Sequence, residues 1–354
     1  MALADLWAWE LLVAAFAGGA FGAAVGALQS FSLAGLLVVV GELYALVHRT
    51  TGLDAAAVDI TGSIGFGPVL GPHVAFGGGA AAVAFAARRG YVDTEFEFHD
   101  AKHVTRGLGS RPDVLVVGGV FGVVGYWVAT LSVTLGVPTD PVALGVVASA
   151  LLHRVTFGYD LIGTSPGRVF DMSPFERGER RQPEGSVAAD GGAGRFVVEP
   201  WLPYQYRWSH VTVLGAAVGV LGAYVAYLTA SAFLAFGISV VALAFLCADV
   251  AEIPVTHHIS LPASTVVLAR VEGSGAVTPD LVASTLPLGE ALLLGAVFGV
   301  LGALAGEGLQ RVFYAHADTH LDPPAASIVV TTLLIGGLAM LGILPSAAWI
   351  PLPT

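Results

Sequence analysis

The pattern Gly-x-x-x-Gly occurs in four long apolar runs of this sequence. A further glycine follows each copy after three or four residues, at Gly26, Gly125, Gly222 and Gly302. The copies span Gly18 to Gly22, Gly118 to Gly122, Gly215 to Gly219 and Gly295 to Gly299. Small residues at this spacing share one face of a helix and allow two helix backbones to approach closely in lipid. The pattern therefore predicts an all-α polytopic membrane protein whose helices pack in close pairs.

The composition excludes an ordinary soluble domain. Of the 354 residues, 55% are hydrophobic and only 12% are charged, about half the usual share of charged residues. Because backbone amides in lipid must be paired within the chain, we expect helices. The lone cysteine, Cys247, excludes a disulfide framework. The net charge of −11 argues against nucleic acid as a partner and suits a halophilic, archaeal source.

Eight apolar runs are long enough to be transmembrane helices. They cover residues 9–29, 31–48, 113–136, 141–158, 209–230, 231–250, 287–313 and 325–347. Two further runs are broken: 64–87 is interrupted by several glycines and prolines, and 253–269 is interrupted by Pro254 and Pro262. We expect these two to be broken or re-entrant segments.

The sequence indicates two tandem repeats. Residues 118–125 (GGVFGVVG) match residues 295–302 (GAVFGVLG), and each copy is followed by an Asp-Pro pair, at Asp140 and Asp322. The predicted units are a first membrane repeat over 1–160, a polar cytoplasmic linker over 161–206 and a second membrane repeat over 207–354. The end of the linker, 201–208, is typical of an aromatic belt at a membrane surface.

Two topologies remain open. If the broken segments enter and leave on one side, the chain has eight spans, and the distribution of arginine places both termini in the cytoplasm. If the broken segments cross, the chain has ten spans and its repeats are inverted. We expect the first arrangement, in a multi-pass protein of the cell membrane.

Each broken segment contains histidine after a proline, at His73 and at His257-His258. Irregular backbone at membrane depth is tolerated only against protein or a water-filled cavity, so matched breaks point to a transport site. An unpaired carboxylate at mid-bilayer costs at least about 2.5 kcal/mol, which marks acidic residues near the spans. The predicted transport-site residues are His73, His257, His258, Glu42, Asp249 and Glu252. The alternative is that both segments are kinked packing elements.

A second candidate site lies near the end of the chain. His316, Asp318, His320 and Asp322 alternate, so an extended strand would point all four to one face. Imidazole and carboxylate together suit zinc or another divalent metal. A solvated loop would contain the same residues, and the aspartates before Pro141 and Pro323 also indicate helix N-caps.

The segment Gly65-Phe-Gly-Pro-Val-Leu-Gly-Pro-His73 and the glycine-rich stretch 295–306 resemble parts of the integral membrane subunits of the sodium-translocating tetrahydromethanopterin:coenzyme M methyltransferase. The resemblance covers roughly a tenth of the chain. It implies a sodium-conducting membrane subunit that works beside partner proteins.

We therefore expect a transporter or channel for a small ion or solute, with sodium or a proton as candidate coupling ion and a pathway between the broken segments. The alternatives are a non-transporting scaffold or accessory subunit and a membrane metalloenzyme; an enzyme is the less expected class. The expected partners are the lipid bilayer, the ion or solute, and a second copy or another membrane subunit. No cofactor is expected beyond bound sodium or a divalent metal.

Overall fold

The computed structural model describes residues 3–51, 58–92, 97–165, 167–181, 194–271 and 277–353. Over these residues the chain is helical, and β pairing is limited to one isolated bridge between Arg180 and Phe196. The expected all-α class is confirmed.

The elements follow the apolar runs. The first half contains α1 (Trp9–Val25), α2 (Ala27–Thr51), the π-helical turn η2 (Thr61–Gly65), α3 (Ala75–Arg88), α4 (Pro112–Thr134) and α5 (Pro141–Phe157). The second half contains α7 (Trp208–Thr229), α8 (Leu234–Val241), α9 (Leu243–Cys247), α10 (His257–Ala269), α12 (Leu288–Phe313) and α13 (Pro323–Met340). Short elements are η1 (Leu3–Trp7), η3 (Asp100–Lys102), α6 (Ser173–Glu176) and α11 (Pro279–Thr285).

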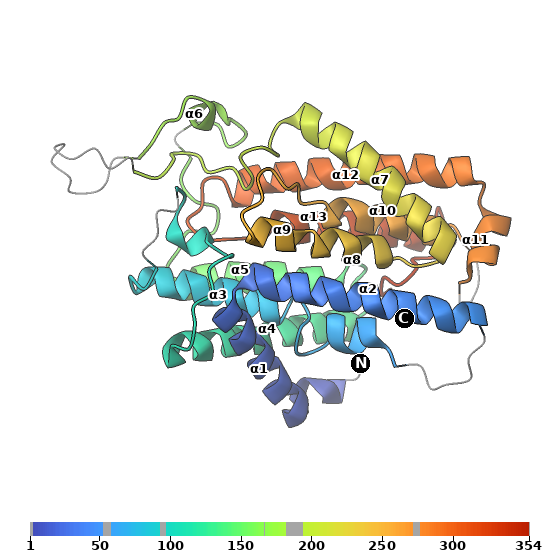
Figure 1. Ribbon diagram of the computed structural model, residues 1–354, viewed down its shortest axis with the longest axis horizontal. Helices are drawn as coiled ribbons and strands as arrows, with labels where there is room; N and C mark the ends of the chain where they lie inside the picture. The colour runs from blue at the N-terminus through green and yellow to red at the C-terminus, as the bar shows by residue number, and fades with distance from the viewer. Residues whose placement is uncertain are drawn as a thin grey trace.

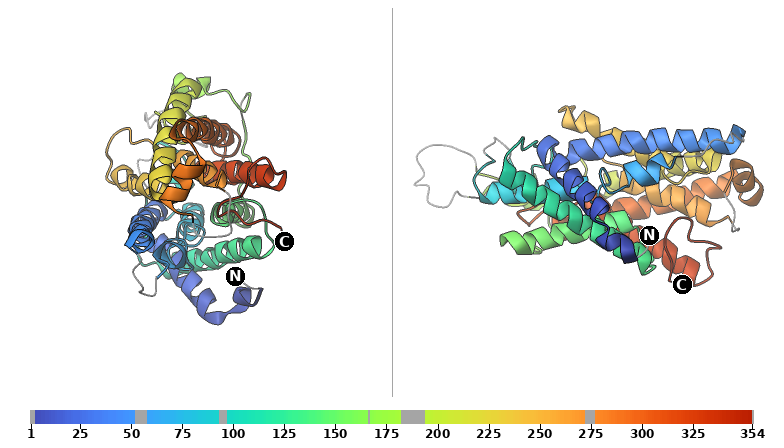
Figure 2. Two further views of the ribbon diagram at one scale, coloured as in Figure 1. Left: turned by 90° about the vertical axis from the view of Figure 1, so that its right-hand side faces the viewer. Right: turned by 90° about the horizontal axis from the view of Figure 1, so that it is seen from below.

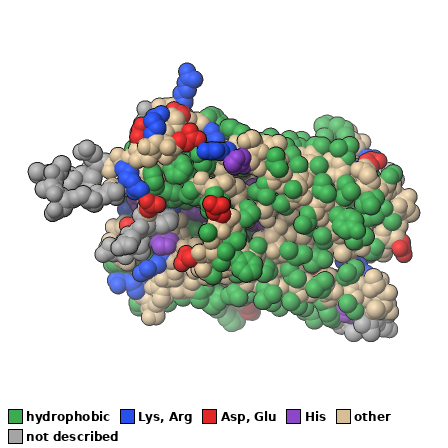
Figure 3. Space-filling view, turned by 45° about the horizontal axis from the view of Figure 1, so that its top comes forward, with side chains coloured by type: hydrophobic (Ala, Val, Ile, Leu, Met, Phe, Trp, Pro, Cys, Tyr) green, Lys and Arg blue, Asp and Glu red, His purple; other side chains and the backbone are tan. Residues whose placement is uncertain are grey.

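Within the described ranges, five helices are long and apolar enough to cross a membrane by length and composition: α2, α4, α7, α12 and α13. Large apolar side chains such as Leu36, Val116 and Leu293 are exposed on their outer faces. Figure 3 shows hydrophobic side chains along the body and charged side chains gathered at one end. An apolar outer surface of this kind is stable in lipid rather than in water, so the structure supports a helical membrane protein.

Loops from distant parts of the sequence meet at the charged end of the molecule (Figure 1). This polar end consists of residues 97–111, 159–181, 194–207 and 314–322, with residue 166 outside the described ranges. Ion pairs join these loops: Lys102 to Glu199 at 2.6 Å and Arg180 to Glu97 at 2.5 Å. Both chain termini lie away from the polar end (Figures 1 and 2).

The glycine stripes bring helices together in pairs, as the sequence predicts. In the second half, a methyl group on Gly219 of α7 would overlap the backbone of Gly295 and Gly299 of α12. In the first half, Gly19 of α1 lies in the same way against α4. The pairs α1–α4 and α7–α12 are thus built alike.

Both predicted breaks are present. Residues 66–74 are irregular before α3, and residues 248–256 are irregular before α10. Pro262, which we expected to interrupt the second segment, instead lies inside a continuous α10, where it cannot donate the usual amide hydrogen to the carbonyl of His258. That carbonyl faces Gly302 of α12, and the carbonyl of His73 faces Gly125 of α4 in the same way.

The two halves meet through α2 and α8, and through α5 and α13. Gly35 of α2 lies against Val240 of α8. Thr139, just before α5, lies 3.0 Å from Thr332 of α13. The first irregular segment also contacts the second half, because the ring of Phe66 packs against the rings of Phe233 and Phe236.

Candidate functional site

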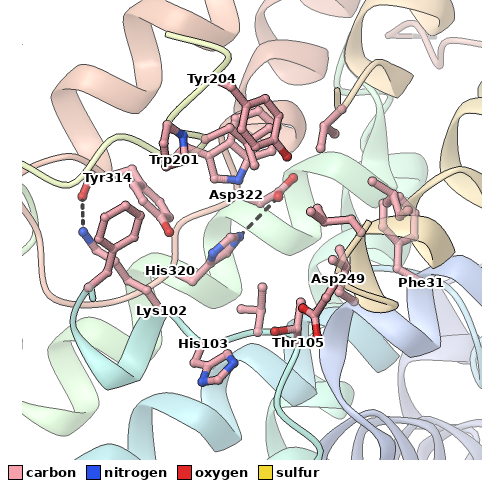
Figure 4. A pocket seen from close by; sticks show the side chains of 18 of the residues that line it. Phe31, Lys102, His103, Thr105, Trp201, Tyr204, Asp249, Tyr314, His320 and Asp322 are labelled. Carbon is pink, nitrogen blue, oxygen red and sulfur yellow. Dashed lines mark hydrogen bonds and ion pairs between the residues drawn. The ribbon is translucent and has the colours of Figure 1, made fainter. Parts of the chain in front are cut away.

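A partly open cavity of about 410 Å³ lies at the polar end, and we call it the vestibule. Its walls come from α2, from the loops 97–105, 201–204 and 314–322, and from α9 and the irregular segment after it. Figure 4 shows aromatic side chains around a central carboxylate. The labelled residues are Phe31, Lys102, His103, Thr105, Trp201, Tyr204, Asp249, Tyr314, His320 and Asp322.

Part of the vestibule wall is formed by His257 and Asp322, at the N-terminal ends of α10 and α13. One carboxylate oxygen of Asp322 accepts the amide hydrogen of Ala325 at 2.8 Å. The other lies 3.3 Å from Nε2 of His320. Asp322 is therefore the N-cap that the Asp-Pro sequence predicts, and it also lines the cavity.

A smaller cavity of about 30 Å³, the inner cavity, shares Phe31, His257 and Asp322 with the vestibule. It continues to Pro72 and Asp140 in the first half. Asp140 caps α5 by accepting amide hydrogens at 2.8 and 3.1 Å. The two capping aspartates, Asp140 of α5 and Asp322 of α13, thus lie beside one cavity.

Lys102 holds one wall of the vestibule in place. Its Nζ lies 2.6 Å from a carboxylate oxygen of Glu199, donates to the carbonyl of Tyr314 at 2.8 Å and lies 4.4 Å from the centre of the Tyr314 ring. Burial lowers the pKa of Lys102 to about 8, although the charge of Glu199 acts in the opposite direction. The ion pair balances the charge of this lysine.

Of the predicted transport-site residues, His257 and Asp249 line the vestibule. His73 and His258 are buried but line neither cavity. The ring of His258 packs edge-on against Trp201, with ring centres 6.1 Å apart. Glu252 also lies outside both linings.

Glu42 contacts residues that do not line the vestibule. Its two oxygens accept hydrogen bonds from Thr61 at 2.8 Å and from Ser231 at 2.6 Å. Thr61 belongs to η2, and the hydroxyl of Ser231 accepts the amide hydrogen of Leu234 at the start of α8. This carboxylate therefore joins the two halves. It lines neither cavity.

The four predicted metal ligands point in different directions. His316 lies 3.0 Å from the carbonyl of Val169, and Asp318 pairs with Arg195 at 2.7 Å, whereas His320 and Asp322 face the vestibule. Residues 314–319 form turns and bends rather than the extended strand that the spacing required. Within the described ranges, no group of three or more His, Cys, Asp or Glu residues is arranged to hold a metal ion.

Several lining residues were not singled out by the sequence. Trp201 and Tyr204 belong to the expected aromatic belt but line the vestibule. Asp140 was assigned only as an N-cap. In the sequence, Lys102 stands out only because it is the sole lysine beside fourteen arginines.

A family model described as "Family of unknown function (DUF7973)" matches residues 1–353. The chain belongs to this family. The DUF7973 match includes both halves, the linker and every residue that lines the vestibule. Searches of curated proteins and of solved structures gave no match.

Proposed function

We propose that this chain is a transporter that moves a small ion or solute through the vestibule and the inner cavity. One observation carries the proposal: both cavities meet at His257 and Asp322, between the two irregular segments. Phe66 and Pro72 of the first segment line the inner cavity, and Asp249 of the second lines the vestibule. Discontinuous helices around a central site are the arrangement that secondary transporters use.

We also infer ten spans in two inverted repeats, which favours the second of the two topologies considered above. The supporting evidence is that, among the described residues and apart from the short elements η1, η3, α6 and α11, each half offers five helical segments in the same order. In this comparison η2 and α3 form one segment, and α8 and α9 form another. Equivalent glycine contacts pair α1 with α4 and α7 with α12. An odd number of crossings per repeat reverses the second repeat in the membrane.

The orientation follows from the basic residues. Arg311 binds the carbonyls of Phe170 and Tyr206 at the polar end, where most other arginines also lie, whereas Arg49 and Arg270 belong to the opposite end. The positive-inside rule then places the polar end in the cytoplasm. Both termini fall on the other side, unlike the arrangement expected with eight spans.

The identity of a coupling ion stays a prediction. The inner cavity is large enough for about one small ion or water, and Asp140 and Asp322 beside it are suitable partners for sodium or a proton. The resemblance to the methyltransferase subunits and the expected second copy or complex partner also stay predictions.

Cysteine accessibility tests transport without knowledge of the substrate. In a Cys247→Ala background, Ile328→Cys places a thiol on the inner cavity. Leu36→Cys, whose parent side chain is exposed on the outer face of α2, is the lipid-facing control. Vesicles of known orientation are treated with a membrane-impermeant maleimide from one side or the other.

Alternating access predicts that the thiol at position 328 is labelled from both sides, because the cavity opens to each in turn. The control should be labelled from neither. Labelling of position 328 from one side only, or from neither, overturns the transporter proposal and favours a static scaffold.

A further inference from the structure

We propose that the vestibule binds a protonated organic amine. The ammonium group lies between Asp322 and His257, and the apolar body of the ligand lies against Phe31, Trp201 and Tyr204. The inference rests on the proposed function in one respect: the amine would be the transported solute. Binding itself can be tested without transport.

The charge of the vestibule selects a cation. Lys102 is neutralised by Glu199, and Glu97 by Arg180. Asp322 pairs only with His320, and no lysine or arginine in the described part of the chain forms an ion pair with Asp322 or Asp249. The lining therefore carries unbalanced negative charge, which would repel an anion and would leave a carboxylate poorly solvated beside a neutral ligand.

The size and the walls of the vestibule select an organic ligand. A volume of about 410 Å³ lies within the range of sites for small organic molecules, roughly 300–1,000 Å³. Aromatic rings surround the carboxylate (Figure 4), and aromatic faces attract cations most strongly where water is excluded. A bare inorganic ion would need the inner cavity instead.

A ring nitrogen of His257 in the vestibule wall favours an ammonium group that has an N–H to donate. His257 lines the vestibule with only 3% of its surface exposed, and its Nδ1 has no hydrogen-bond partner among the residues that the structure describes. A neutral imidazole can accept one hydrogen bond through a ring nitrogen. An N–H of the ligand would satisfy this buried atom, whereas a quaternary ammonium could not.

Calorimetric titration of the purified full-length protein tests the class of ligand. The probes are 2-phenylethylamine, which is cationic at neutral pH, and 2-phenylethanol, a neutral molecule of nearly the same shape. We expect the amine to bind at least about ten-fold more tightly. Equal affinities, or no binding of the amine at millimolar concentration, overturn the proposal.

A variant pair tests the position of the charge. Asp322→Asn removes the charge but keeps a side chain that caps helices well, so we expect a loss of about ten-fold in amine affinity. Glu42→Gln is the matched control, because Glu42 is equally buried, at 8% exposed against 9% for Asp322, yet lines neither cavity. Equal amine affinity in wild type and Asp322→Asn contradicts the assignment.

Trp201→Leu distinguishes a contact between the Trp201 ring and the ammonium group from a role of Trp201 in packing alone. The substitution keeps an apolar wall but removes the aromatic face, so the preference for the amine over the alcohol should shrink. Weakening of both ligands by the same factor contradicts the proposed contact. Amine binding with one-sided labelling of position 328 would refute transport alone, whereas two-sided labelling without an amine preference would refute this inference alone.

Discussion

Gly302→Ala is predicted to destabilise the protein by pushing α12 away from α10. A Cβ atom at Gly302 would lie 2.5 Å from the carbonyl oxygen of His258 and 3.3 Å from Cγ of Pro262. Ordinary van der Waals contact begins at 3.4 Å. The carbonyl would therefore have to move by roughly 0.9 Å, and it belongs to backbone that is packed on every side.

The magnitude follows from a control in the same helix. Gly308 also lies in α12, but a methyl group there would meet only the Trp208 ring, at 4.0 Å. Both substitutions gain about 1 kcal/mol from the higher helix propensity of alanine. Only Gly302→Ala bears the overpacking cost, typically about 1–3 kcal/mol, so the two variants should differ by that amount.

Reversible unfolding of both variants in the same detergent measures the difference in free energy of unfolding. We expect Gly308→Ala to be slightly more stable than wild type and Gly302→Ala to be less stable than Gly308→Ala. Equal stability of the two variants would show that the α10–α12 contact is looser than described and would refute the reasoning.

Three further predictions concern buried charges. Glu199→Gln leaves Lys102 buried without its counter-charge and should lower the free energy of unfolding by about 3–5 kcal/mol, whereas Glu179→Gln, in an exposed pair, should change it by less than about 1 kcal/mol. The folded-state pKa of Lys102 is lowered from 10.5 to about 8, so the unfolded chain holds this proton more strongly. The free energy of unfolding should therefore rise with pH from about 8 to 10.5. Unfolding measured across this pH range should show a smaller rise for Lys102→Met than for the wild type. Glu42→Ala removes the acceptor of two buried hydroxyl groups and should lower the free energy of unfolding by about 1–3 kcal/mol in the same assay. An unchanged midpoint of unfolding would contradict the described contacts.

Local features were predictable because they depend on neighbouring residues. The apolar runs specify helices, Asp140 and Asp322 specify N-caps, and the glycine stripes specify close helix pairs. The break before α3 was also predictable from its glycines and prolines, and the break before α10 from Pro254. The continuation of α10 through Pro262 was not predictable, because surrounding helices can hold a proline within a continuous helix in spite of its missing amide hydrogen.

The candidate site could be predicted only in part. His257 and Asp249 were expected to act together, and His320 and Asp322 were assigned to a separate metal site, but all four line one vestibule. Trp201 lines it as well, although its sequence context indicated a membrane surface. Sequence spacing shows which residues share a helix face, but it does not show which loops meet at the end of a bundle.

The sequence by itself determined the helices, their caps, their breaks and the apolar surface, because hydrophobic periodicity and backbone chemistry act over a few residues. Tertiary structure alone decided which charges are balanced and which face a cavity. Lys102 finds Glu199 across 97 positions of sequence, while the one ion-pair partner of Asp322 in the described part of the chain is His320. The physical reason is that electrostatic partners are chosen by distance in the folded protein, and packing of remote segments sets that distance.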